Sequence, residues 1–368
     1  MTTTYRYLLV NIVSNTIIAE LPFTSVGFTQ QLNQAGSFQG HILLSGLNDG
    51  TVNSATYNVL EATIPAKTGI YVDRNGVLVW GGVIWGRTYD STSQILTIQA
   101  REWISYFERR RITDNLSYTN IDQLVIAKSL IQWAQTEPYG NLGILYNTQG
   151  QTTSGVLIDR IYYSYEYKSV FTAIQDLSRQ DDGFDFYIDV SYDAITGLPK
   201  KAFNTYYPRS GGGTTPTWIF PAGNVVEYEY PENGMIAANT IYASGAGSNE
   251  GKLEAFAQDV TKFAEGWALL DDVINYSDVT DQAVLNALAV GQVTAFAYPP
   301  TTIKLVAPPY EDPEFGTYEV GDDARIMIKD DRFPDGYDED YRIVGISIQP
   351  GESGPERVTL TLTQGTGA

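Results

Sequence analysis

The sequence predicts a mainly β protein of the α+β class, with one β-barrel in each terminal part of the chain and mixed α/β domains inserted between them. Short runs of alternating apolar and polar residues fill both terminal parts, and turn residues separate them every ~8–12 positions, as is typical of barrels and sandwiches. Longer runs with helical periodicity lie mainly in the middle of the chain. The 368 residues leave room for roughly two or three cores. We expect four blocks, residues 1–112, 113–222, 223–310 and 311–368.

The first block, residues 1–112, is expected to be a small barrel or sandwich. Its strand-forming segments are TYRYLLVNIVSNTIIAELP, which turns at Ser14-Asn15, then SFQGHILLSG, and then ATYNVLEATIPAKTGIYVDRNGVLVW. Asn75-Gly76 predicts a two-residue hairpin turn, because both residues tolerate positive φ. Apart from a short helix at the end, the block carries only strand and turn signals.

The end of this block carries two further signals. Gly81-Gly82 lies where a regular strand would have side chains, and it predicts a β-bulge or a sharp barrel bend. A short amphipathic helix is expected over Glu102–Glu108, because Trp103 and Phe107 lie four residues apart and would share one helix face.

The second block, residues 113–222, is predicted to mix helices and strands. A helix is expected over Asn120–Glu137, ended by Pro138. Its apolar stripe at helical spacing consists of Ile121, Leu124, Val125, Ala127, Leu130, Ile131 and Trp133. A second helix, Ser169–Gln180, is expected to lead into the strand Phe184–Val190.

The third block, residues 223–310, should contain the strands Val225–Tyr230 and Ala238–Ala243, a helix over Thr280–Ala297, and a strand in TTIKLVAPP. The fourth block, residues 311–368, is predicted to be strands that complete a second barrel. Apolar residues alternate with polar ones at Ala324, Ile326 and Ile328 and again at Val358, Leu360 and Leu362.

Composition excludes several classes of protein. The formal net charge of −20 argues against binding nucleic acid through its phosphates, which requires clustered Lys and Arg. Cysteine is absent, so disulfides and thiolate metal sites are excluded. No apolar run is long enough to span a bilayer, and the N-terminus lacks a signal-peptide pattern, so we expect a soluble protein without a membrane segment. The 26 tyrosines suit both β-sheets and protein interfaces.

Three segments, in this order, resemble the baseplate or tail-tip hub proteins of long-tailed bacteriophages, which are often called minor tail proteins. They are VWGGVIWGRTYD with ILTIQAREWISYFERRRI, then SVFTAIQDLSRQDDGFDFYIDV, and then YEVGDDARIMI with YRIVGISIQPG and ERVTLTL. The resemblance covers most of the chain, and it consists of strand, Gly and Trp patterns without an invariant active site.

The resemblance implies a trimer in which each subunit contributes two tube-like β-barrels, giving a ring of pseudo-sixfold symmetry that matches a hexameric tail tube. Such a ring would close the tube at the distal end of the tail in the virion after assembly in the host cytoplasm. Its partners would be itself, the distal tail protein, the tape measure protein and tip or fibre proteins. DNA would pass through without specific binding, and an acidic wall would reduce the sticking of phosphates. Many relatives carry additional C-terminal host-binding or wall-degrading domains; this sequence ends at Ala368, so we expect no such added activity.

We expect no catalytic, cofactor-binding or metal-binding residues, and therefore no enzyme. GAGSNEG contains Gly245, Gly247 and Gly251 and imitates a dinucleotide-binding loop, but Glu250 stands where the third glycine of GxGxxG belongs, so a hairpin loop is favoured. The acidic residues Asp330, Asp331, Asp335, Asp338, Glu339 and Asp340 could hold a hard cation. Their spacing fails the EF-hand pattern, and a solvated loop between two strands is favoured.

Two further features have a structural and a functional interpretation. His41 in QGHILLS has no nucleophile-elbow GxSxG to accompany it, so we interpret it as a histidine on the sheet surface. The run Arg109-Arg110-Arg111 follows the short helix, where cations complement the helix dipole. The alternative hypothesis is that this run contacts an acidic surface of a neighbouring copy.

The best prediction from sequence is thus a structural hub protein without enzymatic activity. The alternative is a virion-associated polysaccharide-binding or glycoside-hydrolysing module, supported only by the aromatic residues and by the abundance of acidic residues, since 43 of them always offer pairs. A tail-tube or distal-tail ring subunit is disfavoured by length, because one barrel would suffice for it.

Overall fold

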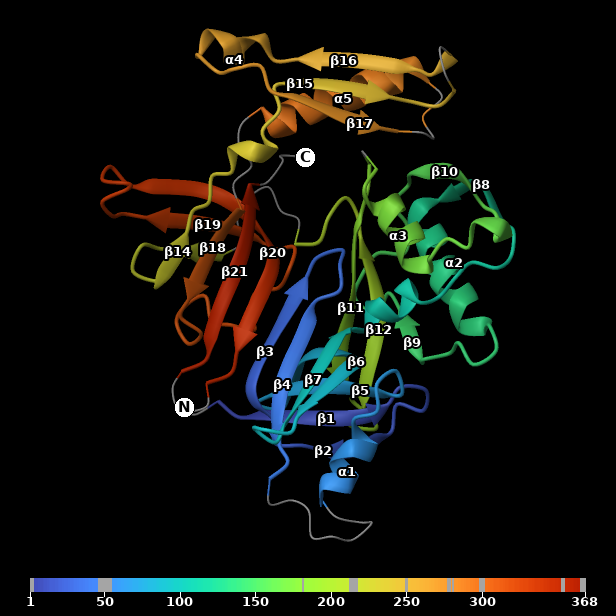
Figure 1. The fold of residues 1–368 in the computed structure, drawn as a ribbon, viewed down its shortest axis with the longest axis vertical. Helices are drawn as coiled ribbons and strands as arrows, with labels where there is room; N and C mark the ends of the chain where they lie inside the picture. The colour runs from blue at the N-terminus through green and yellow to red at the C-terminus, as the bar shows by residue number, and fades with distance from the viewer. Residues whose placement is uncertain are drawn as a thin grey trace. The chain divides into compact units, whose positions relative to one another are not determined.

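One large sheet organises most of the chain (Figure 1). The computed structural model describes residues 3–45, 55–180, 182–211, 218–248, 251–276, 279, 281–297, 302–351 and 355–364. Two units are distinguished. Unit 1 comprises residues 1–228 and 304–368, and unit 2 comprises residues 229–303.

The large sheet takes its strands from both ends of the chain. Along its main path the strands follow the order β14-β18-β21-β20-β3-β4-β7-β6-β5-β1-β2, and β19 and β13 branch from β20. Their bounds are β1 Tyr5–Asn11, β2 Ile17–Glu20, β3 Thr24–Gln31, β4 Ser37–Leu43, β5 Thr68–Arg74, β6 Val77–Asp90, β7 Ile95–Glu102, β13 Trp218–Phe220, β14 Glu227–Glu229, β18 Thr302–Ala307, β19 Asp323–Ile328, β20 Tyr337–Gln349 and β21 Arg357–Gln364.

The first and last strand blocks are joined directly, at β3 and β20. Gly345 to Ile348 of β20 pair antiparallel with Gln31 to Phe28 of β3, while the earlier half of β20 pairs with β19. The prediction of a mainly β fold is confirmed, but two separate barrels are not. The described strands form no closed barrel and follow one open path from β14 to β2. The physical reason is the length of β20, whose 13 residues serve neighbours from both blocks.

The predicted apolar alternation places side chains in the core. Ala324, Ile326 and Ile328 of β19 are buried, and so are Val358, Leu360 and Leu362 of β21. In the first block, an aromatic cluster lies on the buried face of the sheet, where Phe38 packs against Phe23 at 5.6 Å between ring centroids and against Trp80 at the same distance. Burying rings of this size is the largest single source of stabilisation in such a core.

The predicted hairpin at Asn75-Gly76 is confirmed. Asn75 has φ 54° and Gly76 has φ 88°, and the turn joins the antiparallel strands β5 and β6. The turn at Ser14-Asn15 is also confirmed, between β1 and β2, with Asn15 at φ 55°.

The predicted bulge at Gly81-Gly82 is wrong in position. These glycines pair regularly with Tyr71 and Ile70. The register shifts instead two residues before them, at Val79, and three residues after them, at Trp85. The glycines are required by close approach. A Cβ atom on Gly82 would lie 2.1 Å from the carbonyl oxygen of Arg101, and one on Gly81 would lie 2.7 Å from Nε1 of Trp103. Here the backbone of β6 packs too tightly for a side chain.

One segment expected to be strand is helical. Part of ATYNVLEATIP forms α1, Ala55–Ala62, with Val59 and Ala62 buried three residues apart, which is helical spacing. The short helix after β7 is the 3₁₀ helix η1, Trp103–Glu108, and both Trp103 and Phe107 are fully buried as predicted.

The middle block contains the predicted helices with shifted ends. Its elements are β8 Leu116–Asp122, α2 Gln123–Thr136, β9 Ile144–Tyr146, β10 Leu157–Tyr162, η2 Ser164–Glu166, α3 Val170–Ser178, β11 Asp185–Tyr192 and β12 Pro199–Tyr206. Helix α2 begins three residues later than predicted because Asp122 caps it, accepting a hydrogen bond from Leu124 N at 2.9 Å. Ser169 caps α3 in the same way through Thr172 N.

The helices and strands of the middle block share one core with the first block. Leu124, Leu130 and Ile131 of α2 are fully buried in the same cluster as Trp103 and Phe107. Strands β8 and β10 form a two-stranded antiparallel sheet, and β11-β12-β9 form a three-stranded sheet. Strands β8, β9, β10, β12 and β13 were not predicted.

Unit 2 is a small α/β layer. Its elements are η3 Gly234–Ile236, β15 Thr240–Ser244, β16 Glu254–Gln258, α4 Val260–Ala264, β17 Asp271–Asn275 and α5 Gln282–Phe296. The strands lie in the order β16-β15-β17, and α5 packs on one face through Leu285, Ala289 and Val293. The predicted strand Ala238–Ala243 and the predicted helix Thr280–Ala297 are confirmed with shifted ends, as β15 and α5. Strands β16 and β17 and helix α4 were not predicted. None of the described helices of the chain has the length and apolarity needed to cross a membrane.

The close approach at β6 makes a testable prediction. Gly82→Ala should destabilise unit 1 by about 1–3 kcal/mol, because the new methyl group meets a backbone carbonyl that has no room to move. Gly223→Ala is the control, since a Cβ there meets no atom within 4 Å. Urea unfolding of both variants checks this, and equal free energies of unfolding would contradict it.

Candidate functional site

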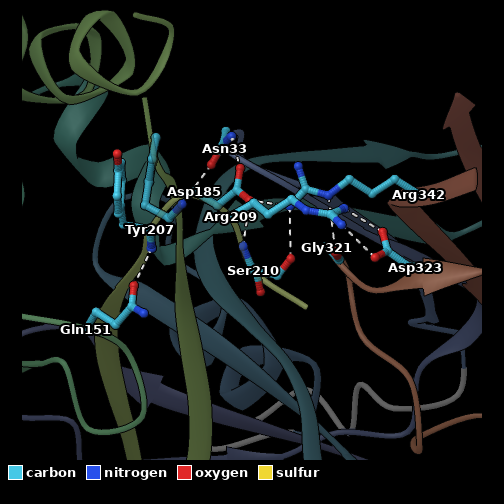
Figure 2. A network of polar contacts seen from close by, with 10 residues as sticks. Asn33, Gln151, Asp185, Tyr207, Arg209, Ser210, Gly321, Asp323 and Arg342 are labelled. Carbon is cyan, nitrogen blue, oxygen red and sulfur yellow. Dashed lines mark hydrogen bonds and ion pairs between the residues drawn. The ribbon is translucent and has the colours of Figure 1, made fainter. Parts of the chain in front are cut away.

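Asp185 is the centre of a buried polar network that joins three parts of unit 1 (Figure 2). Its Oδ1 accepts a hydrogen bond from Nδ2 of Asn33, in the β3–β4 turn, at 2.8 Å. Its Oδ2 accepts one from Ser210 N, after β12, at 2.8 Å. The guanidinium of Arg342, in β20, forms an ion pair with the same oxygen. The first, middle and last parts of the chain therefore meet at one carboxylate.

The guanidinium of Arg342 is satisfied on several sides. Its Nε donates to the carbonyl oxygen of Gly321 at 3.1 Å, and its terminal nitrogen donates to the carbonyl oxygen of Ser210 at 3.1 Å. Next to it, Arg209 and Asp323 form a bidentate pair at 2.5 and 2.7 Å. Hydrogen bonds that saturate both partners are what makes a buried ion pair tolerable.

A second buried ion pair joins the two ends of the chain. Arg74, at the end of β5, donates from Nε to both carboxylate oxygens of Glu356, at 3.2 and 3.1 Å. The hydroxyl of Tyr5 donates to the same carboxylate, and burial together with this acceptor raises the pKa of Tyr5. The side chain of Glu356 is only 1% exposed, so its charge depends on these two partners.

A small cavity next to these contacts contains three acidic side chains. Its volume is about 140 Å³, and its lining includes Glu102, Asp189 and Glu319. Burial raises the pKa of Glu102 to about 8, although the N–H groups of Gly36 and Gln31 act in the opposite direction. The pKa of Glu319 is raised mainly by burial and secondly by the negative charge of Asp189. Burial also raises the pKa of Asp189. The described residues contain no group of acidic or histidine side chains arranged to hold a metal ion.

Lys201 is a buried cation that forms no ion pair with a carboxylate in the described part of the chain. Its Nζ donates to Oδ1 of Asn15 at 2.9 Å and lies 4.3 Å from the centre of the Trp103 ring. Burial lowers the pKa of Lys201 to about 8. The amide oxygen of Asn15 also accepts from the hydroxyl of Tyr71 at 3.0 Å, so this cluster attaches β12 to the β1–β2 turn.

Unit 1 carries an apolar groove of about 970 Å³. Ile18 of β2, Leu43 of β4 and Val59 of α1 line it, with Glu61 and Lys67 among the few charged lining residues. Sequence reasoning missed this groove because it treated α1 as strand.

The motifs weighed from sequence lie in different elements of the chain. GAGSNEG connects the antiparallel strands β15 and β16, so its described part is a hairpin connection, as favoured. The acidic segment 330–340 spans the loop between β19 and β20 and the start of β20, where Asp338 pairs with Arg325 at 2.6 Å. His41 lies half-buried in β4, opposite Thr97 of β7.

The arginine run divides between two environments. Arg110 is half-buried, and its terminal nitrogen donates to the carbonyl oxygen of Ala134 in the last turn of α2, at 3.3 Å. This is the capping role proposed from sequence, applied to a different helix. Arg109 and Arg111 are exposed.

Sequence reasoning missed the network around Asp185. The only available signal was an acidic residue at the second position of the predicted strand Phe184–Val190, between Phe184 and Phe186. An exposed acid there would be equally ordinary. The partners Asn33 and Arg342 lie 152 and 157 residues away.

The network makes a prediction about stability. Asp185→Asn should cost unit 1 about 3–5 kcal/mol, because it leaves the buried guanidinium of Arg342 unpaired. The control is Asp338→Asn, which breaks the exposed pair with Arg325 and should cost far less, because solvent screens that pair. Urea unfolding at neutral pH measures both, and equal losses would contradict the importance of the network.

The carboxyl of Glu102 makes a prediction about pH. The pKa of Glu102 is about 8 in the folded protein and lower in the unfolded chain, so the folded state binds the extra proton between these values. Its contribution to stability is therefore lost as pH rises towards 8. Relative to Glu102→Gln, the wild-type free energy of unfolding should fall by up to about 1.4 kcal/mol per pH unit between pH 5 and 8. Urea unfolding across this range tests it, and parallel pH profiles would refute it.

Comparison with solved structures identifies the fold. The chain is similar to the tail protein of prophage MuSo2 from Shewanella oneidensis, with a TM-score of 0.61, 12% identity and 98% coverage of both chains. It is similar to a tail protein from Neisseria meningitidis, with a TM-score of 0.59 and 13% identity; the match covers 97% of this chain and 96% of the Neisseria protein. It is also similar to a prophage tail protein from Listeria monocytogenes, with a TM-score of 0.54 and 15% identity; the match covers 97% of this chain and 94% of the Listeria protein. No protein-family model and no curated protein sequence matches. The chain thus has the fold of phage tail proteins over its whole length.

Proposed function

We propose that this chain is a structural, non-enzymatic virion protein: the tail-tip baseplate hub that closes the tail tube of a long-tailed bacteriophage. The observation that supports this most is the coverage of the fold likeness, which spans 98% of this chain and 98% of the Shewanella tail protein. The likeness therefore includes the strand blocks, the middle block and unit 2 together. An added enzymatic domain is not needed to account for any part of this fold.

In this proposal three copies form a ring around a channel. The two lobes of the large sheet, β1–β7 and β18–β21, each act as one tube-like module. Three chains then present six lobes, which matches the sixfold symmetry of a tail tube. The ring lies at the distal end of the tail after assembly in the host cytoplasm, between the distal tail and tape measure proteins on one side and tip or fibre proteins on the other.

The charge of the chain suits a channel for DNA. With 43 acidic against 23 basic residues, the net charge of the chain repels phosphates. A genome would then pass without specific contacts. The buried ion pairs of Asp185 with Arg342 and of Glu356 with Arg74 suit a structural role, because they hold distant segments of one subunit together while the tail transmits force.

Electron microscopy with two-dimensional averaging tests this proposal. The full chain, alone and mixed with its distal tail protein, should give threefold particles with a central hole and a mass of three 40.6 kDa chains. A sixfold ring would indicate a tube-type subunit. A compact monomer even in the presence of the other tail proteins would overturn the hub and favour an assay for glycan binding or hydrolysis.

A further inference from the structure

Unit 2 presents an open sheet face with an apolar row. Helix α5 packs on the opposite face, against residues such as Ile241 and Ala243. On the open face Tyr242, Phe256 and Val273 lie directly opposite one another across the three strands. They are 46%, 57% and 71% exposed, and the rings of Tyr242 and Phe256 lie 5.4 Å apart. An exposed row of this kind is typical of a surface that another protein covers.

Acidic side chains border this row. Glu254 of β16 and Asp271 of β17 lie two residues from Phe256 and Val273 along their strands, so they belong to the same face, and both are exposed. Unit 2 as a whole has ten acidic and two basic residues between positions 229 and 303. We call Tyr242, Phe256, Val273, Glu254 and Asp271 the acidic sheet face. Its chemistry requires a partner that is both basic and aromatic or apolar.

Unit 1 contains a surface of that chemistry. Arg109 and Arg111 are exposed, and neither has an ion pair within the part of the chain that the structure describes. Tyr163, Tyr165 and Tyr167 are 41%, 70% and 62% exposed, and the first two stack with their centroids 5.2 Å apart and their planes 17° from parallel. We call these five residues the basic tyrosine patch.

Backbone pairing brings the two halves of this patch together. Ile112 N donates to Lys168 O at 3.0 Å, and Arg111 forms a β-bridge with Ser169. Lys168 is already paired with Asp176, and Glu166 is the one acidic side chain in segment 163–168, so the two arginines determine the charge of the patch. Arg and Tyr are among the residue types most enriched where proteins bind one another.

A ring of three identical chains needs two different surfaces on each subunit. Its contacts are head-to-tail, so the surface on one copy must be complementary to a distinct surface on the next. The acidic sheet face and the basic tyrosine patch are complementary in charge, and both carry exposed aromatic rings. Opposite charges of this kind select the partner and its orientation.

We propose that the acidic sheet face of one copy docks on the basic tyrosine patch of a second copy and forms the subunit contact of the ring. This inference rests on the proposed function, since it assigns surfaces to the trimer. It narrows the arginine run to Arg109 and Arg111 as the residues that reach a neighbour, because Arg110 caps α2 within the chain.

Charge reversal on each side, followed by their combination, tests this contact in the full-length protein. Native mass spectrometry and light scattering at several concentrations should show a wild-type trimer. Arg109→Glu with Arg111→Glu, and separately Glu254→Lys with Asp271→Lys, should each weaken association at least tenfold. The four substitutions together restore opposite charges and should restore the trimer. The matched controls are the exposed Lys329→Glu and Glu311→Lys, which should leave it unchanged. Unaltered circular dichroism and melting of every variant shows that the fold is retained.

The outcomes separate this inference from the proposed function. A wild-type trimer that both pairs of reversals leave intact overturns this interface and leaves the hub ring standing. Loss of the trimer in both pairs without recovery in the combined variant also overturns the direct pairing. A wild type that stays monomeric at every concentration and with the other tail proteins present overturns both.

Discussion

The contact between Arg342 and Asp185 is the constraint on which the arrangement of unit 1 depends. Two charges removed from water are stable only where every remaining donor and acceptor has a partner. Here those partners come from the β3–β4 turn, from the segment after β12 and from the loop before β19. Each segment must therefore lie where its polar group reaches the pair. Because the three segments belong to different parts of the chain, one pair fixes all of them.

The large sheet also depends on one element, strand β20, which pairs with strands from both ends of the chain. Strand β20 pairs with β21 along its length, with β19 near its start and with β3 near its end. The first and last strand blocks are thus paired through a short run of β3, Gln31 to Phe28. The ion pairs of Asp185 with Arg342 and of Glu356 with Arg74 add further contacts between the blocks. This continuity means that strain on one lobe of the sheet is carried into the other by hydrogen bonds as well as by side-chain packing.

Periodicity predicted the local structure well where one physical rule acts alone. The alternation in β19 and β21 and the turn at Asn75-Gly76 are decided by residues a few positions apart. Prediction failed where distant residues decide. Gly81 and Gly82 are glycines because Trp103 and Arg101 approach them, and the segment at Ala55–Ala62 forms a helix although its composition also suits a strand. None of these neighbours is near in sequence.

The sequence by itself determined a mainly β chain, acidic, free of cysteine, with strand blocks at both ends and helices between them, since composition and periodicity are properties of short segments. Its resemblance to tail hub proteins agrees with the fold. Only the tertiary structure decided that the two strand blocks share one sheet, that Asp185 gathers three segments, and that Arg110 turns inward while Arg109 and Arg111 face outward. The physical reason is that pairing across more than 150 residues depends on which groups can satisfy one another once buried, and a single sequence does not state which partner each will find.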